Sequence, residues 1–298
     1  MTRPCKVGVQ LPEVERFVPW PEYLDLARRA ESAGYDSVWV GDHLVYDLPD
    51  GSTRGPYEAW TTLAAIAAVT ERVEIGPLVA STGFHAPAML AKQAATVDAI
   101  SQGRLILGLG AGWNRREFEA FGFPYDRRVS RFEEALAVIV PLLREGRTTF
   151  HGEFYDVDDC VLDPRPHRAG GPRLMLGSNS PRMLSIGLPV VDSWNVWWSI
   201  YDNSVEKFAQ VKVEVDAATP EGRSVEATAA VLVTLPGGRG RLMGETYDAH
   251  VATVTPDNLG KHVQGLADAG ATHLQLVLDP ITAETIDTVG TVLADLDR

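Results

Sequence analysis

The chain has 298 residues, of which 45% are hydrophobic and 22% are charged, and its formal net charge is −13. These values are typical of a globular protein with a sizeable core, folded as one large barrel or as two ordinary domains. A surface this acidic would not attract nucleic acid or an anionic membrane, so we expect neither as a partner.

Residues that bind metals or form disulfides are sparse. The two cysteines, Cys5 and Cys160, lie far apart in the sequence, which excludes a disulfide framework and a cysteine-based zinc site. None of the seven histidines forms a His-x-His or a helical His pair, so we expect no metal. No apolar signal core precedes Pro12, and no run approaches the length of a membrane span. We therefore expect a cytoplasmic protein.

Strand patterns and helix patterns alternate eight times along the chain. The fourth strand pattern, RLILGLG, is apolar on both faces, as a parallel strand covered by helices should be. The eight predicted strands are residues 5–11, 36–42, 73–80, 104–110, 173–177, 190–198, 226–236 and 272–278. Two segments interrupt the rhythm: residues 146–172, with the alternation and turn residues of a hairpin, and the glycine-rich residues 236–250.

Eight β/α units without a linker predict a (β/α)8 TIM barrel as a single domain over residues 1–298. The interruptions are then insertions after strands 4 and 7. A doubly wound sheet is the alternative, but it usually has fewer strands and leaves two edges exposed. In a barrel the active site lies at the carboxyl ends of the strands, so residues that follow a strand become the candidates for chemistry.

The second strand pattern ends on Asp42 and His43. Side chains alternate along a strand, and His43 shares the face of Trp39 and Gly41. A histidine at this position can act as an acid or a base near neutral pH. A loop histidine hydrogen-bonded to backbone is the alternative, and the position at a strand end favours the catalytic interpretation.

The third and fourth strands end irregularly. Pro77 lies within the third, which a central strand tolerates at a bulge; the alternative is a loop that begins early. Gly108, Gly110 and Gly112 form G-x-G-x-G at the end of the fourth, where another group can approach the backbone closely. This spacing is a weak dinucleotide signature, and close packing at the strand end explains it at least as well.

After the fifth strand, Gly177, Ser178, Asn179 and Ser180 precede a proline and a helical pattern. Capping of the helix alone explains these residues, and the same geometry also makes an anion site. Five arginines follow the fourth strand and alternate with glutamates, as on solvated helix faces, although one or two could neutralise an acidic cofactor tail. They are Arg115, Arg116, Arg127, Arg128 and Arg131, among Glu117, Glu119, Glu133 and Glu134.

Several of these stretches together resemble the bacterial luciferase-like family of flavin- and deazaflavin-dependent oxidoreductases, over nearly the whole chain. The stretches are GYDSVWVGDHL, RVEIGPLV, HAPAMLAKQAATVDAISQGRLILGLGAGWNRREFEAFG and LMLGSNSPRMLSIGLPVVDSWN. The resemblance implies a (β/α)8 barrel with an insertion after the fourth unit. The pattern GDHL is similar to that of the branch that uses the deazaflavin coenzyme F-420.

The resemblance also implies a site. Asp42 and His43 would lie beside the cofactor ring, and a non-proline cis peptide between Leu78 and Val79 would support the back of the ring. Gly110, Ala111, Gly112 and Asn114 would line the ring and tail, and Gly177, Ser178, Asn179 and Ser180 would hold the phosphate. Four tryptophans near predicted strand ends are the candidate walls of the substrate pocket: Trp39, Trp113, Trp194 and Trp197.

The implied activity is F-420-dependent hydride transfer between C5 of the deazaflavin and a small organic substrate. His43 would move the accompanying proton, and Asp42 would tune or orient His43. Trp113 stands where the similar sugar-phosphate dehydrogenases carry a glutamate, which disfavours glucose 6-phosphate. The alternatives are an FMN-dependent monooxygenase and, less favoured, a non-catalytic flavin-binding protein. A homodimer is also implied, because the relatives are often dimers.

Overall fold

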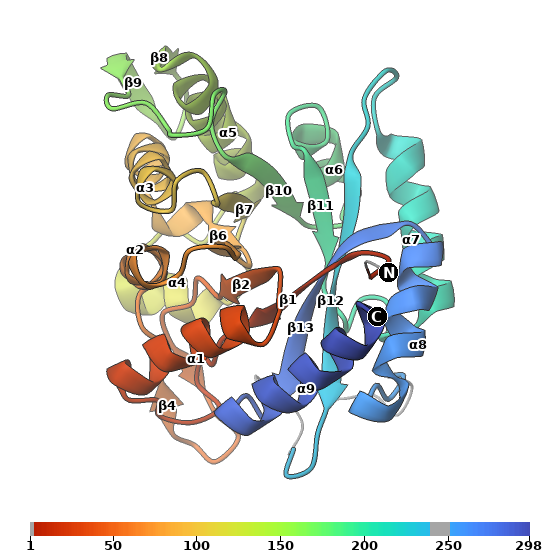
Figure 1. Ribbon diagram of the computed structural model, residues 1–298. Helices are drawn as coiled ribbons and strands as arrows, with labels where there is room; N and C mark the ends of the chain where they lie inside the picture. Colours follow the sequence, from red (N-terminus) through yellow and green to blue (C-terminus); the bar gives the residue numbers. More distant parts are fainter. Residues whose placement is uncertain (1–2, 239–250) are drawn as a thin grey trace.

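The computed structural model describes residues 3–238 and 251–298, whose parallel strands form a ring (Figure 1). In chain order the strands of the ring are β1 (Lys6–Gln10), β2 (Ser37–Val40), β5 (Glu74–Pro77), β6 (Ala80–Ser81), β7 (Ile106–Gly110), β10 (Arg173–Gly177), β11 (Ser193–Val196), β12 (Glu226–Thr234) and β13 (Ala271–Asp279). Their spatial order is β5-β2-β1-β13-β12-β11-β10-β7-β6, with every pair parallel. This arrangement confirms the predicted TIM barrel.

The third strand of the barrel is divided into two short pieces. β5 pairs with β2, whereas β6 pairs with β7, and an isolated bridge between Ile75 and Leu105 also joins the two sides. The peptide bond between Leu78 and Val79, which separates the two pieces, is cis, as the resemblance implied. The irregularity expected at Pro77 is therefore a break within the strand, which resumes at Ala80.

Helices cover the outside of the ring (Figure 1). They are α1 (Trp20–Ser32), α2 (Ala59–Val69), α3 (Pro87–Ile100), α4 (Arg115–Phe121), α5 (Arg128–Glu145), α6 (Pro181–Gly187), α7 (Val205–Ala218), α8 (Pro256–Asp268) and α9 (Ala283–Leu296). A proline in the first turn begins α1, α3, α6 and α8, where its missing N–H group costs nothing. None of the described helices is long and apolar enough to cross a membrane.

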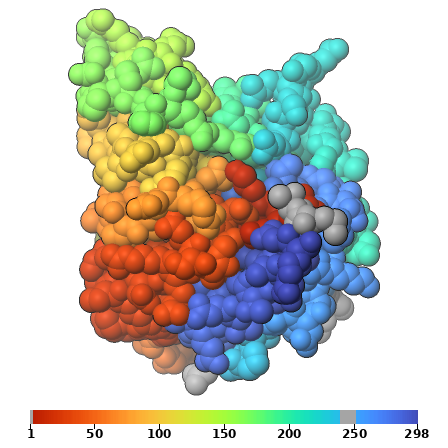
Figure 2. Space-filling model, in the orientation of Figure 1, coloured from red at the N-terminus to blue at the C-terminus, as the bar shows by residue number. Residues whose placement is uncertain are grey.

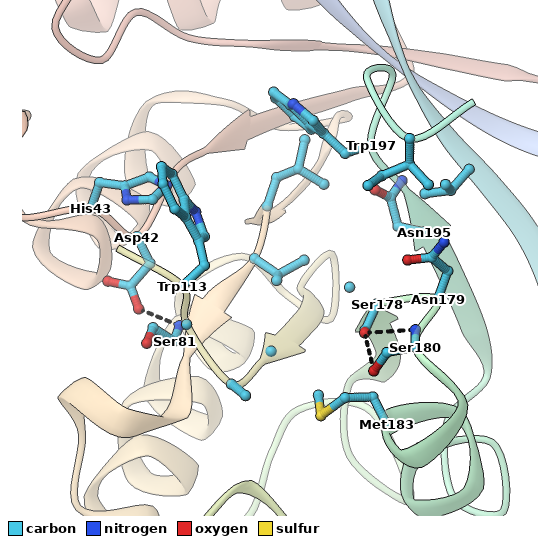
Figure 3. Close-up of a pocket in the computed structure, with 18 of the residues that line it drawn as sticks. Asp42, His43, Ser81, Trp113, Ser178, Asn179, Ser180, Met183, Asn195 and Trp197 are labelled. Atoms are coloured by element: carbon cyan, nitrogen blue, oxygen red, sulfur yellow. Dashed lines mark hydrogen bonds between the residues drawn. The ribbon is translucent and has the colours of Figure 1, made fainter. Parts of the chain in front are cut away.

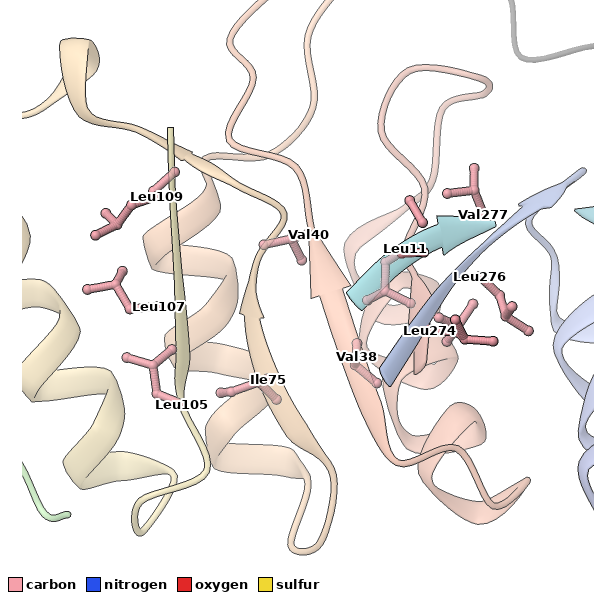
Figure 4. Close-up of a cluster of buried hydrophobic side chains, with 14 of the residues drawn as sticks. Leu11, Val38, Val40, Ile75, Leu105, Leu107, Leu109, Leu274, Leu276 and Val277 are labelled. Atoms are coloured by element: carbon pink, nitrogen blue, oxygen red, sulfur yellow. The ribbon is translucent and has the colours of Figure 1, made fainter. Parts of the chain in front are cut away.

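The core lies on both faces of the strands because their side chains alternate. Figure 4 shows Val38, Leu107 and Leu276 among the side chains that pack between strands and helices, and all three are fully buried. A smaller apolar cluster includes Trp39, Ile106 and Met175. Burying each such side chain stabilises the fold by roughly 1.5–3 kcal/mol, so a continuous apolar strand is favoured only where both faces are covered.

The segment 146–172 contains the expected hairpin, formed by β8 (Arg147–His151) and β9 (Asp156–Val161) in antiparallel register. It projects from one corner of the molecule, at the upper left of Figure 2. A second, smaller ribbon, β3 (Tyr46–Asp47) with β4 (Thr53–Arg54), follows β2. Of the expected insertion at residues 236–250, all but the first three residues lie outside the described chain.

Candidate active site

A pocket with a volume of about 470 Å³ lies at the carboxyl ends of the strands. Segments that follow six strands contribute to its walls, so residues far apart in the sequence meet there. Among the residues expected from the sequence, the lining includes Asp42, His43, Leu78, Val79, Gly110, Ala111, Gly112, Trp113, Gly177, Ser178, Asn179, Ser180 and Trp197. Figure 3 shows His43, Asp42 and Trp113 on one side of the pocket and Ser178, Asn195 and Trp197 on the other.

Three of the expected site residues do not line this pocket. The side chain of Asn114 caps α4 instead, since its Oδ1 accepts the Arg116 backbone N–H at 3.2 Å and its Nδ2 donates to the Val45 carbonyl at 3.2 Å. The side-chain amide of Asn114 is therefore used to begin a helix, and a contact between Asn114 and the cofactor stays a prediction.

The other two are Trp39 and Trp194, both fully buried. Trp39 points into the barrel below the pocket, donates from Nε1 to Ser37 Oγ at 2.7 Å and lines a separate cavity of about 260 Å³. Trp194 stacks on Phe208 of α7, on the outer face of the barrel. Asn195, the next residue, lines the pocket, so alternation along β11 turns Trp194 away from it. Both tryptophans belong to the core.

His43 is held by a buried carboxylate. Its Nδ1 lies 3.1 Å from each carboxylate oxygen of Glu117, and the Glu117 side chain is 1% exposed. Oε1 of Glu117 also accepts the backbone N–H of Leu44 at 2.6 Å. Glu117 was expected on a solvated helix face; in the structure the first turn of α4 packs against the segment after β2 and buries it. The expectation was wrong for this residue.

The charges around His43 favour its protonated form. Burial lowers the pKa of His43, but the hydrogen bond that His43 Nδ1–H donates to Glu117 and the negative charges of Glu13, Glu117 and Asp42 outweigh burial, so the net pKa is raised. The pKa of the imidazole therefore lies above its usual value. The imidazole ring also lies 4.7 Å from the Tyr46 ring and 5.9 Å from the Trp113 ring, measured between centroids.

Asp42 has a different partner from the one expected. Its Oδ2 accepts the backbone N–H of Ser81 at 2.8 Å and lies 2.9 Å from Nε2 of His85. Both side chains of this ion pair are largely buried. Asp42 therefore connects the end of β2 to β6 and His85, and the contact that orients His43 comes from Glu117.

Glu13 is a pocket residue that the sequence reasoning passed over. Its side chain lines the pocket and accepts a hydrogen bond from Gln10 Nε2 at 2.7 Å. A Cβ atom added to Gly41 would lie 1.6 Å from Oε1 of Glu13, so only glycine allows this approach. The available signal was its position just after the first strand, where barrel enzymes place functional residues.

Glycines form a surface around the break in the third strand. Cβ atoms added to Gly108, Gly110 or Gly177 would lie 2.8, 2.9 and 2.5 Å from the Val79 side chain. Gly108 and Gly110 of the G-x-G-x-G pattern are therefore required by close packing of β7 against Val79, and Gly112, with φ +75°, by its approach to Ser81 and Phe118, as the packing interpretation stated. The same absence of side chains leaves the backbone of these strand ends open to the pocket.

At the far end of the pocket, α6 begins after Ser180, whose side chain makes no capping hydrogen bond. The Ser180 backbone N–H donates to Ser178 Oγ at 3.3 Å. Of the five arginines noted after the fourth strand, Arg128 lines the pocket. Its Nε donates to the Gly112 carbonyl at 3.1 Å, and its guanidinium lies 3.8 Å from the Tyr125 ring centroid. The other four form ion pairs with exposed carboxylates: Arg115 with Glu119, Arg116 with Asp47, Arg127 with Glu153 and Arg131 with Asp126.

The luciferase-like monooxygenase family model matches residues 6–235, so the chain belongs to this family. The chain is 37% identical over 182 residues to an F-420-dependent glucose-6-phosphate dehydrogenase from Kineococcus radiotolerans, covering 57% of this chain and 52% of that protein. It is 32% identical over 179 residues to a phthiodiolone/phenolphthiodiolone dimycocerosates ketoreductase from Mycobacterium tuberculosis, covering 54% and 47%. The matches therefore span about half the length of these curated relatives.

Solved structures share the fold. An F-420-dependent secondary alcohol dehydrogenase in complex with an F-420–acetone adduct superposes with a TM-score of 0.75 at 20% identity, covering 100% of both chains. The F-420-dependent tetrahydromethanopterin reductase of Methanopyrus kandleri gives a TM-score of 0.78 at 18% identity, covering 99% of both. An FMN-bound type II Baeyer–Villiger monooxygenase from Pseudomonas putida gives 0.75 at 15% identity, covering 98% of both. At these identities the comparison establishes the architecture.

Proposed function

We propose that this protein is an F-420-dependent oxidoreductase that transfers a hydride between C5 of the deazaflavin and a small organic substrate, with His43 as proton donor or acceptor. The observation that carries the proposal is the placement of His43 in the pocket wall, with Nδ1 fixed by buried Glu117. Because Nδ1 is engaged, Nε2 is the nitrogen left for proton exchange with a substrate.

The pocket fits a planar ring with an anionic tail. Its floor is formed by Val79 with Gly110 and Gly177, whose lack of side chains lets the Val79 side chain pack against their backbone. The buried hydroxyl of Ser81 lines the pocket and has no hydrogen-bond partner among the described residues, as expected for a group that meets a ligand. Serine hydroxyls, the start of a helix and Arg128 supply donors and positive charge towards one end.

On this proposal, parts of the chain correspond to parts of the cofactor. Leu78 and Val79 would support the ring, Gly110–Gly112 would lie along it, and Gly177–Ser180 with Arg128 would hold the phosphate. When bound, F-420 would supply a site that accepts or donates a hydride. The Glu117 carboxylate keeps a proton on Nδ1 of His43, and the apolar side chains of the walls exclude water from the reacting atoms.

F-420 is preferred to FMN because the relative with 37% identity is F-420-dependent, whereas the FMN-bound protein shares only the fold. A cytoplasmic location, expected from the cysteine content and the sequence pattern, and a homodimer, which the family resemblance suggests, are parts of the proposal. A titration followed by absorbance tests the cofactor choice. F-420 should bind at least 10-fold more tightly than FMN, and tighter binding of FMN would replace the proposal with the monooxygenase alternative.

A further inference from the structure

The pocket has a strong charge asymmetry that the proposed function does not use. Within the described chain, its lining contains three carboxylates, Glu13, Asp42 and Glu117, and a single positively charged side chain of the lysine or arginine type, Arg128. The three carboxylates lie around His43: Glu117 contacts its Nδ1, Asp42 precedes it in the chain, and a Cβ atom added to Gly41 would lie 1.6 Å from Oε1 of Glu13 and 3.3 Å from Cδ2 of His43. The part of the pocket next to the proton-exchanging residue is therefore electronegative.

Arg128 cannot offset these charges for a substrate. Its guanidinium is fixed by the carbonyls of Gly112 and Tyr125, both at 3.1 Å, and by stacking on the Tyr125 ring. That position is beside Gly112, and the proposed function assigns Arg128 to the phosphate of the cofactor. An anionic group on a substrate near His43 would face three carboxylates against a single imidazolium, and Arg128 is the only lysine or arginine among the described residues of the lining.

Aromatic and apolar side chains line the pocket on the His43 side and across from it. Trp113, which is 55% exposed, lies with its edge towards the His43 ring, and Trp197 faces the pocket from the segment after β11 (Figure 3). Tyr46 and Phe84 also line the pocket. Such side chains bind most favourably an apolar ligand that buries the surface of their rings, and they offer few polar groups to a hydrophilic ligand.

We infer that the substrate of this pocket is an uncharged, largely apolar molecule with a ring-sized body, and not a phosphate ester or a carboxylate. This inference rests on the proposed function only in taking the His43 side of the pocket as the substrate side. It places Trp113 and Trp197 as walls that bind the apolar body. Glu13, Asp42 and Glu117 are the charges that exclude anions.

The test compares a matched pair of ligands, 1-(2-naphthyl)ethanol and its phosphate monoester. Both are titrated by calorimetry into enzyme saturated with F-420, so that the phosphate site of the cofactor is already filled. The alcohol should bind at least about 10-fold more tightly than the ester, because the ester brings a dianion close to three carboxylates. Equal or tighter binding of the ester overturns the inference.

Two variants show whether the stated residues cause the difference. In Glu13→Gln the affinity for the ester should rise about 5- to 30-fold while that for the alcohol changes less than about twofold, since one negative charge is removed with little change of shape. In Trp197→Ala the affinity for the alcohol should fall about 10-fold, with cofactor affinity within about twofold of wild type. Equal effects of Glu13→Gln on both ligands, or no effect of Trp197→Ala on the alcohol, would contradict the assignment.

Binding, not turnover, is the measurement, so the inference and the proposed function fail separately. If F-420 does not bind, the proposed function is wrong, and the ligand pair is then measured on the enzyme saturated with FMN or, if that does not bind either, on the free enzyme. A preference for the alcohol in that case would support the substrate class on its own. A preference for the ester on F-420-loaded enzyme would leave the cofactor assignment intact and remove the substrate class.

Discussion

Both carboxylate oxygens of Glu117 lie 3.1 Å from Nδ1 of His43, across 74 residues of sequence. The carboxylate is almost inaccessible, and it also accepts the backbone N–H of Leu44. A buried carboxylate with several donors is fixed in position, and it fixes the ring that it binds. Glu117 is therefore a positioning residue: it determines which nitrogen of His43 carries the proton and where the other nitrogen points.

Glu117→Gln should lower the pKa of His43. The raised pKa of His43 in the wild type means that the imidazolium persists to higher pH than in a free histidine, and loss of the Glu117 charge removes part of that support. The His43 limb of the pH–rate profile should move to lower pH, and kcat should fall about 10- to 100-fold with little change in KM. Imidazole NMR signals would report the same shift.

A matched control for this variant lies two residues further along α4. Glu119→Gln removes an exposed carboxylate paired with Arg115 on the same helix, so it should leave both the pH profile and kcat unchanged. A Glu117→Gln enzyme with the pH profile of wild type would show that the contact has no influence on proton transfer, whatever its effect on rate.

His43→Ala should reduce turnover about 100-fold or more, since it removes the group that moves the proton. Cofactor affinity should stay within about twofold, because the glycine floor and the Ser178–Ser180 segment are untouched. Added imidazole should restore part of the rate. His151→Ala, in the exposed β8–β9 hairpin, serves as the control. A near-normal rate for His43→Ala would make this histidine a bystander.

Asp42→Ala should act first on stability. It leaves His85 and the Ser81 backbone N–H without the partner found at 2.9 and 2.8 Å, in a buried setting. Breaking a buried pair of this kind costs about 3 kcal/mol of unfolding free energy, measurable by urea denaturation. Asp47→Ala, which removes an exposed ion pair with Arg116, should cost less than about 1 kcal/mol. Equal costs would contradict the structural role of Asp42.

Burial of His273 should make the free energy of unfolding decrease at acidic pH. Burial lowers the pKa of His273 to about 3, and the positive charges of Lys6 and Arg173 add to the effect. An unfolded histidine titrates near pH 6.5, so between these values only the unfolded chain takes up the proton. The contribution of neutral His273 to stability is fully present above about pH 6.5. Below that pH the free energy of unfolding falls by about 1.4 kcal/mol per pH unit.

Urea denaturation at pH values about one unit apart, between pH 7 and pH 5, would measure this slope. His273→Gln should have a shallower dependence than wild type, and the exposed His167→Gln should match wild type. If all three proteins lost stability in parallel, other groups would account for the acid sensitivity and His273 would not.

Gly177→Ala should disturb the floor of the pocket. The added Cβ would lie 2.5 Å from a methyl carbon of Val79, which is too close for either group to stay in place. Overpacking of this kind costs about 1–3 kcal/mol, and the displaced Val79 should weaken cofactor binding as well. Gly260→Ala in α8, where the nearest atom is 3.3 Å away on flexible Leu296, should be neutral or stabilising by up to about 1 kcal/mol. Unchanged stability and cofactor affinity in Gly177→Ala would argue against a tight floor.

The barrel could be predicted from the sequence because its signal repeats. Eight apolar runs separated by helical patterns leave few alternatives, and the rule that sites follow strands brings residues such as His43 and Ser178 to one end before any coordinates are known. The rule fixes which end of a strand a residue occupies. It does not fix the depth at which a side chain lies or the partner that it finds.

The corrections follow from that limit. Trp39 and Trp194 are near strand ends, but Trp39 lies inside the barrel below the pocket and Trp194 faces the helices outside the barrel. Glu117 stands in a run of alternating charges that is typical of an exposed helix, and only the packing of α4 against the segment after β2 buries it. Its distance of 74 residues from His43 carries no local signal. Asn114 matched a family position, while its local role as a helix cap took precedence.

The change of neighbours along the third strand has a mechanical consequence. β5 is hydrogen-bonded to β2 and β6 to β7, so the ring of strands closes through the short segment that contains Leu78 and Val79. A planar ligand bound against this segment would contact both β5 and β6 and hold them together. Ligand binding should therefore slow amide hydrogen exchange in β5 and β6 more than in β12 and β13, which pair with each other over nearly their whole length.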